Sequence, residues 1–148
     1  MQPVKAVSRL NDNITLFVFA VVACVLGLLL SSVKVHAAPA TFTVTNNNST
    51  GSGSLVEAIQ NANSNNNPSE RDTINFNIPG AGPHYIVPPY GGGPTYVTEP
   101  ITLDGTTQTG SECGGELKIV YDTTNTRNSP LELALSASGS FVKGIDFY

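Results

Sequence analysis

Residues 42–76 read FTVTNNNSTGSGSLVEAIQNANSNNNPSERDTINF, and this stretch decides the fold. It holds a short strand pattern, a turn of Gly, Ser and Asn, one amphipathic helix, an Asn-rich loop and a second strand pattern. Both strand patterns alternate apolar and polar residues, which turns one face toward a core and the other toward water. Because further strand-like runs continue to Tyr148, we predict an all-β chain with one short helix near its start.

The helix is predicted over residues 54–63. Ser54 and Glu57 have the spacing of a capping box, in which the Ser hydroxyl accepts from a free backbone N–H and the Glu side chain reaches back to the cap residue. Apolar residues recur at spacings of three and four to form one stripe, which consists of Leu55, Ala58, Ile59 and Ala62. A helix of about nine residues is not stable alone, so we expect this stripe to pack as a lid over the strands.

Strand patterns outside the opening stretch are short and are separated by Gly, Pro, Asn and Ser, the residues that bend or reverse a chain. Including the opening stretch, we predict strands at 41–45, 73–77, 85–87, 96–98, 101–103, 117–121, 131–135 and 141–147.

Eight short motifs follow one another along the chain: Phe42-Thr43-Val44-Thr45-Asn46, Gly53-Ser54-Leu55, Ala58-Ile59, Ala62-Asn63, Asp72-Thr73-Ile74-Asn75-Phe76, Ile78-Pro79-Gly80, Ile101-Thr102-Leu103-Asp104-Gly105-Thr106-Thr107-Gln108 and Val142-Lys143-Gly144-Ile145-Asp146-Phe147. Their order resembles the N-terminal region of bacterial right-handed parallel β-helix proteins, a class of secreted or surface proteins that includes pectate lyases and adhesins.

The resemblance implies the start of a right-handed parallel β-helix whose first rung is covered by a short N-terminal capping helix. The capping residues are then Ser54, Leu55, Glu57 and Ile59. The ends of such a stack need covers, because each rung buries its apolar face only against its neighbours. A small β-sandwich fits the strand spacing about as well and is the alternative fold.

Residues 1–37 are interpreted as a secretory signal peptide. A basic leader precedes an apolar run from Ile14 to Leu30, and small residues follow it. Val35 and Ala37 fit the −3 and −1 positions, so cleavage is expected between Ala37 and Ala38. Two alternatives remain. Residues 14–33 approach the ~20 residues of a membrane anchor, and the residues ending at Cys24 resemble a lipoprotein acylation motif.

The segment 38–148 is predicted to be one exported domain. It carries four Lys or Arg residues against ten Asp or Glu residues, a formal charge of −6. That balance argues against nucleic acid and against anionic membrane surfaces, which attract clustered basic residues. Membrane contact is therefore expected only through residues 14–33, if they are not removed. Cys113 is the single cysteine of the segment and has no nearby His to activate it, so no disulfide within the segment and no catalytic role are expected.

No catalytic, metal or cofactor site is predicted. Asp104-Gly105 is most simply a turn, Asp146 is expected to point outward from a strand, and His84 is expected in a loop without metal-ligand spacing. We therefore expect a non-enzymatic protein of the cell surface or extracellular space, with surface glycans or neighbouring cells as partners. The alternative is the N-terminal fragment of a carbohydrate-active enzyme, a polysaccharide lyase or hydrolase, whose catalytic rungs lie beyond Tyr148. A chain truncated at its C-terminal end is expected on either account, because a repeat array needs several rungs.

Overall fold

The computed structural model describes residues 15, 17–22, 37–92, 95–111, 114–124, 126–127 and 131–148. The chain divides into two units, Met1–Val35 and His36–Tyr148. In the first unit, residues 15 and 17–22 are helical, and the rest of the expected signal segment before Ala37, with Cys24, lies outside the described residues. Cys113 lies outside them as well. Among the described residues, none of the helices has the length and apolar character needed to cross a membrane.

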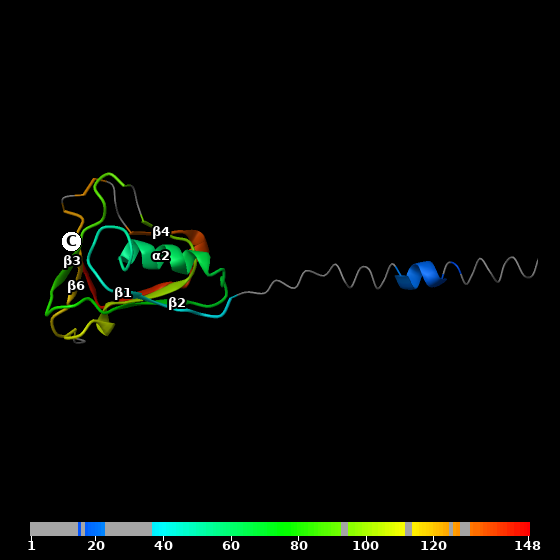
Figure 1. Ribbon diagram of the computed structural model, residues 1–148, viewed down its shortest axis with the longest axis horizontal. Helices are drawn as coiled ribbons and strands as arrows, with labels where there is room; N and C mark the ends of the chain where they lie inside the picture. The colour runs from blue at the N-terminus through cyan, green and yellow to red at the C-terminus, as the bar shows by residue number, and fades with distance from the viewer. Residues whose placement is uncertain are drawn as a thin grey trace, which may run out of the picture. The chain divides into compact units, whose positions relative to one another are not determined.

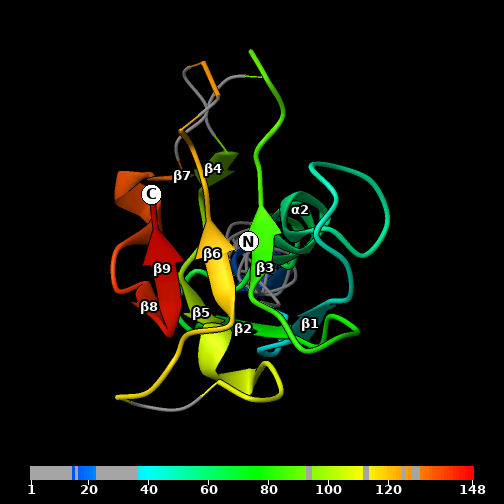
Figure 2. The same cartoon turned by 90° about the vertical axis from the view of Figure 1, so that its left-hand side faces the viewer.

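The described residues of the second unit form short parallel strands and one α-helix (Figures 1 and 2). The strands are β1 (Thr41–Val44), β2 (Asp72–Phe76), β3 (His84–Ile86), β4 (Thr95–Val97), β5 (Ile101–Asp104), β6 (Ile119–Tyr121), β7 (Leu131–Leu133), β8 (Phe141–Lys143) and β9 (Ile145–Phe147). The helix is α2 (Leu55–Ser64), and two 3-10 turns, η1 (Gly105–Thr107) and η2 (Leu135–Ala137), follow β5 and β7.

These strands form three sheets, with strand orders β1-β2-β5-β8, β3-β6-β9 and β4-β7. The chain visits the sheets in a fixed order, from β2 to β3 to β4 and then from β5 to β6 to β7. Every ladder between the described strands is parallel, as the arrows of β3, β6 and β9 show in Figure 2. The prediction of a strand-rich chain is therefore confirmed. The parallel ladders do not support the alternative fold, a small β-sandwich, because sandwiches of that kind pair their strands antiparallel.

Because the strands pair in parallel register, similar side chains of neighbouring strands lie beside one another and form the core. In the first sheet, Ile74 lies beside Leu103, and both side chains are fully buried. Phe42 and Val142 extend this stack at its two ends and are partly buried. Each fully buried side chain of this size contributes about 1.5–3 kcal/mol of transfer free energy, an upper estimate. The alternation of the strand residues thus builds one continuous core.

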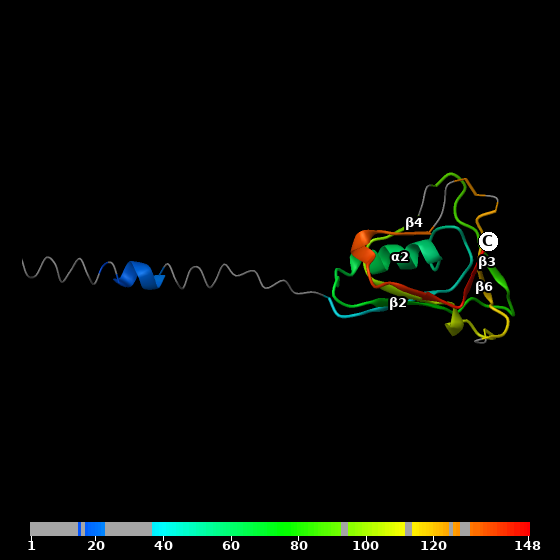
Figure 3. The same cartoon turned by 180° about the vertical axis from the view of Figure 1, so that it is seen from behind.

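The helix covers this core as the apolar stripe predicts. Its buried side chains are Leu55, Ala58, Ile59 and Ala62, and it packs between β4 on one side and β1 and β2 on the other (Figures 1 and 3). Ser54 is the N-cap, and its hydroxyl accepts from the Glu57 N–H at 3.2 Å. The second hydrogen bond of a capping box, from the N-cap N–H to the Glu side chain, is not formed here. The Glu57 carboxylate accepts from the Gly53 N–H at 2.6 Å, because the Ser54 N–H already donates to the Gly51 carbonyl.

Two asparagines cover strand edges at the helix end of the domain. The Asn63 amide donates to the Tyr96 carbonyl and accepts from the Thr98 N–H, both at 2.8 Å. These are the backbone groups of β4 that point away from its partner β7, because the intervening residue bonds to β7. Asn47 likewise donates to the Tyr85 carbonyl of β3, on the side away from β6. Covered edges do not template pairing with another chain.

A buried glutamine fixes the bend after β2. Gln108 is 2 % exposed, and its amide accepts from the Ile78 N–H at 2.8 Å and donates to the Ile78 carbonyl at 2.9 Å. One side chain thereby satisfies both backbone groups of a residue outside any sheet. Buried backbone groups without such partners cost about 1–3 kcal/mol each.

Two predictions about local structure are wrong. The run 141–147, predicted as one strand, is two strands in different sheets, because the chain bends at Gly144, whose φ of +65° favours glycine. His84 does not lie in a loop. It begins β3, its residue is 9 % exposed, and its Nε2 lies 3.4 Å from the Gln108 amide nitrogen.

Candidate functional site

A row of polar side chains crosses the outer face of the first sheet. Thr43, Asn75, Asp104 and Lys143 occupy matching register positions on β1, β2, β5 and β8. They point outward because their neighbours along each strand, such as Leu103, point into the core. Matching positions on parallel strands thus bring an acid and a base together although they are far apart in the sequence.

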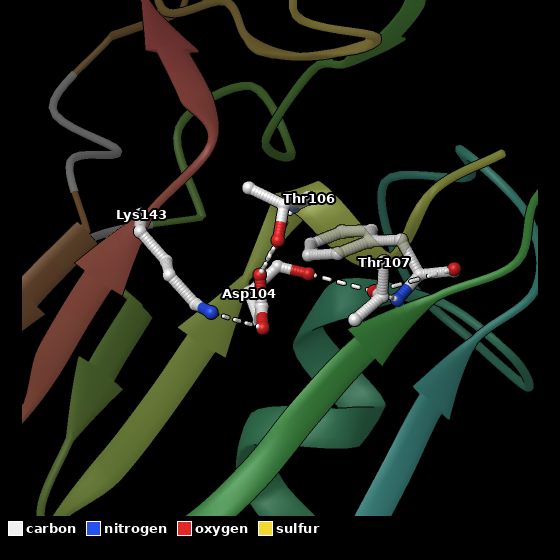
Figure 4. A network of polar contacts seen from close by, with 5 residues as sticks. Asp104, Thr106, Thr107 and Lys143 are labelled. Atoms are coloured by element: carbon white, nitrogen blue, oxygen red, sulfur yellow. Dashed lines mark hydrogen bonds and ion pairs between the residues drawn. The ribbon is translucent and has the colours of Figure 1, made fainter. Parts of the chain in front are cut away.

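Asp104 is the centre of this row (Figure 4). One carboxylate oxygen lies 2.7 Å from the Lys143 ammonium, and the other accepts from the Thr106 N–H at 3.1 Å and from the Thr106 hydroxyl at 2.5 Å. Behind it, the Thr107 hydroxyl donates to the Asp104 carbonyl at 2.7 Å and accepts from the Phe76 N–H at 2.8 Å. The carboxylate therefore caps the turn η1 and also ties β5 to β8.

The electrostatics of this network keep the carboxylate ionised. Burial acts to raise the pKa of Asp104, but the hydrogen bonds from Lys143 and Thr106 and the charge of Lys143 outweigh burial and hold that pKa below its ordinary value. An acid with a lowered pKa is a poor proton donor at neutral pH. Both of its oxygens are also occupied. The arrangement therefore fits a structural role, in which Asp104 holds β5, β8 and η1 together, better than acid–base catalysis.

This network makes the stability of the domain depend on pH. Because the pKa of Asp104 is lowered on folding, its contribution is complete above the unfolded-state value of 3.8 and is lost as the pH falls through the lower folded value. We expect urea unfolding of Asp104→Asn to depend less on pH below about pH 4 than unfolding of the wild type. The difference should be at most about 1 kcal/mol, because Lys143 is 43 % exposed and solvent screens the pair.

The control for this prediction is Glu132→Gln, which removes an exposed carboxylate from β7. The free energy of unfolding of this variant should fall below about pH 4 as steeply as that of the wild type. Equal pH dependence in wild type and Asp104→Asn would show that the network does not favour the ionised carboxylate.

A surface depression lies on the outer face of the second sheet. Tyr85, Val120 and Asp146 hold matching register positions on β3, β6 and β9. The depression has a volume of about 450 Å³, and its lining consists of Pro83, Tyr85, Gly115, Glu116, Leu117, Val120, Asp146 and Tyr148. Tyr85 is 51 % exposed and Tyr148 is 65 % exposed, whereas Val120 forms an almost buried floor. Glu116 pairs at 2.7 Å with Lys118.

This depression combines two kinds of group that suit a polyhydroxylated ligand. Exposed tyrosine rings offer an apolar face with a hydroxyl at the tip. Carboxylates accept hydrogen bonds from hydroxyl groups. Sequence reasoning did not single out Tyr85 or Tyr148. The alternation His84-Tyr85-Ile86, buried-exposed-buried, is the signal that could have placed Tyr85 on the outer face.

The acids considered in the sequence are not brought together. Asp104 lies in the first sheet, where it is bound to Lys143 and Thr106, and Asp146 lies in the second sheet, where it lines the depression. Ala37 and Ala38, the residues of the expected cleavage site, precede β1, and Ser54, Leu55, Glu57 and Ile59 all belong to α2 or its cap. Within the described part of the chain, no group of three or more His, Cys, Asp or Glu residues is arranged to hold a metal ion.

Comparison of the chain with protein-family models, with curated proteins and with solved structures finds no match. The function is therefore inferred from the chain's own residues.

Proposed function

We propose that residues 38–148 form the beginning of a right-handed parallel β-helix with α2 as its N-terminal cap. The support is the order in which the chain visits its sheets, since β2-β3-β4 and β5-β6-β7 pass through the same three sheets in the same sequence. Crossovers between parallel strands of one sheet are right-handed in nearly all proteins, which favours that hand.

On this fold we propose an exported, non-enzymatic protein of the cell surface or extracellular space that binds neutral glycans. The observation that carries the proposal is the depression of about 450 Å³ between Tyr85 and Tyr148, with Asp146 and Glu116 at its wall. A concave site with aromatic walls and a few polar groups is the usual form of a small-molecule or oligosaccharide site.

The charge of the site selects the kind of glycan. Asp146 and Glu116 are two of the ten acids of a segment whose formal charge is −6, and the nearby Lys118 is paired with Glu116. Uronate polymers are therefore repelled, whereas neutral sugars can stack on Tyr85 and donate hydroxyl groups to the carboxylates. Xylan, mannan and chitin oligosaccharides represent the favoured class, and polygalacturonate represents the excluded class.

Replacing Tyr85 with Ala tests this proposal. With protein exported from the full-length chain, we expect the affinity for whichever neutral glycan binds to fall about tenfold, or about 1.4 kcal/mol, because one stacking ring is lost. Isothermal titration measures the affinity, and circular dichroism confirms that the variant is folded. Tyr90→Ala is the matched control, because Tyr90 is 75 % exposed and does not line the depression.

Two results would contradict the proposal. Binding of polygalacturonate alone would remove the neutral-glycan assignment, and an equal loss of affinity in both tyrosine variants would remove the depression as the site.

The second candidate is a carbohydrate-active enzyme, and it is favoured by one observation. Asp104 and Lys143 lie side by side on consecutive strands of one outer face, as the charged groups of a polysaccharide lyase or hydrolase do. Incubation of the exported chain with the same glycans should then yield shorter or unsaturated products, and Asp104→Asn and Lys143→Met should each abolish them. Intact polymers after long incubation would leave glycan binding as the function.

A further inference from the structure

We propose that the α-ammonium group of Ala38, formed when a signal peptidase hydrolyses the Ala37–Ala38 bond, binds in a surface pocket whose lining includes the buried Asn67, the hydrogen-bond partner of the buried Asp72. The inference rests on the proposed export of the chain, and it assigns a role to a polar cluster that glycan binding does not use. Water adds across the peptide bond in the cleavage, which leaves a carboxylate on Ala37 and an amine on Ala38 that takes up a proton.

The pocket lies where the chain enters the strand domain. Its volume is about 310 Å³, and it is lined by Ala37, Ala38, Asn67, Ser69 and Glu70. Both residues of the expected cleavage site thus already belong to its wall. Cleavage would take Ala37 out of this lining and leave Ala38, with its new amine, in it.

Two buried oxygens beside this pocket have no hydrogen-bond partner within the described part of the chain. Asp72 is fully buried, and its Oδ1 accepts three hydrogen bonds, from the Ala40 N–H at 2.7 Å and from the Asn65 and Asn67 amides at 2.9 Å each. Its Oδ2 accepts none, and neither does the Asn67 Oδ1, although Asn67 is only 1 % exposed. A buried carboxylate oxygen without a donor is costly.

Both unpartnered atoms are hydrogen-bond acceptors, so the group that satisfies them must be a donor. A water molecule satisfies acceptors but leaves the buried charge of Asp72 uncompensated, whereas a protonated amine brings three donors and a positive charge. Before cleavage, the Ala38 nitrogen is an amide with a single N–H. Cleavage therefore converts this nitrogen into the kind of group that the pocket lacks.

The segment that carries the new amine is held beside the pocket by the same side chains. The Asn65 amide donates to the Ala38 carbonyl at 2.9 Å as well as to Asp72, and Ala40 is bound directly to Asp72. The ammonium group would thus be placed with little loss of chain entropy, since the residues after it are already ordered.

The charged groups around the pocket favour a cation. Asp72 is buried and bonded to Asn67 of the lining, and Glu70 is itself a lining residue. Arg71 is the adjacent cation, and its guanidinium donates to the Gly139 carbonyl, outside the lining of this pocket. Glu99, in the loop before β5, is a further carboxylate on the neighbouring element, where Pro100 accepts from the Asp72 N–H.

The test uses the full-length chain, exported by a secreting bacterial host. N-terminal sequencing first establishes where the product begins. The pKa of the α-amine is then read from the NMR pH titration of the Ala38 ¹³Cα and ¹³Cβ resonances in uniformly ¹³C,¹⁵N-labelled protein, which leaves all three N–H donors in place. We expect a pKa raised by about one unit above the ordinary 7.7–8.0, a tenfold preference for the protonated form.

Variants identify the acceptors. Asp72→Asn should return the pKa of the amine to its ordinary range, and Asp122→Asn, which changes an exposed carboxylate in the turn after β6, should leave it raised. Because Asp72 also anchors Ala40, Glu70→Gln serves as a second variant that leaves those hydrogen bonds intact, and it should lower the raised pKa in part.

The failures of the two proposals are distinguishable. A product that is retained in the cell overturns the export on which this site depends. A secreted product that begins at another residue leaves export standing and overturns the cleavage at Ala38 and with it the ammonium site. A product that begins at Ala38 with an ordinary α-amine pKa leaves export standing and overturns the ammonium site, with water as the occupant of the pocket.

Discussion

Replacing Ile59 with Asp is expected to prevent the strand domain from folding. Ile59 is 1 % exposed at the centre of the apolar stripe of α2, which packs on β1, β2 and β4. The substitution removes a buried side chain and places a charge without a partner against the core. The expected cost of about 4 kcal/mol or more is comparable to the whole stability of a small domain.

Soluble yield and urea unfolding measure this effect, and Gln60→Asp is the matched control. It introduces the same residue one position later, on the exposed side of α2. The control should remain soluble and lose less than about 1 kcal/mol. We expect Leu55→Asp to aggregate like Ile59→Asp, since Leu55 is also buried. A soluble Ile59→Asp protein with unchanged unfolding would mean that α2 does not cover the core.

Gly144→Ala is expected to cause the second large loss of stability. Gly144 joins β8 to β9 with a φ of +65°, and an added Cβ would lie 2.6 Å from the Thr106 nitrogen and 3.0 Å from the Gly105 carbonyl carbon. These neighbours are backbone atoms of η1, so relief requires the bend between two sheets to move. The steric cost of about 1–3 kcal/mol adds to the cost of about 1–2 kcal/mol of a left-handed alanine.

Gly91→Ala separates these two costs. Gly91 has nearly the same φ, +66°, but an added Cβ would meet no atom within 4 Å. It should lose only the conformational part, about 1–2 kcal/mol, in urea unfolding measured beside Gly144→Ala. Equal losses in the two variants would show that the approach of η1 to Gly144 does not constrain the chain.

Local pattern predicted most of the secondary structure. The alternation around Ile74 and the stripe through Ile59 each depend on neighbouring residues, and the structure confirms the strand and the helix that they predict. The error at Gly144 has the same origin. Phe141 to Phe147 is rich in strand-forming residues on both sides of Gly144, and the position of η1 beside Gly144 shows that the chain changes sheets there.

The candidate sites depend on register, which a single sequence does not contain. Asp104 meets Lys143 because β5 pairs with β8 in one alignment, and a shift of one residue would turn Lys143 to the other face. Gln108 and Asn63 were part of recognisable segments, but each acts on backbone about 30 residues away. Polar side chains are common in turns and near helix ends, so no local pattern indicates that these two bind distant backbone groups.

Asn47 and Asn63 also bear on how the domain can associate. Asn47 binds the Tyr85 carbonyl of β3, and Asn63 binds the Tyr96 carbonyl and the Thr98 N–H, so side chains of the same chain already occupy these outward backbone groups. A strand of another molecule that approached β3 or β4 there would first have to displace an amide side chain. The two asparagines therefore oppose edge-to-edge pairing at these strands, which is the step from which fibres grow.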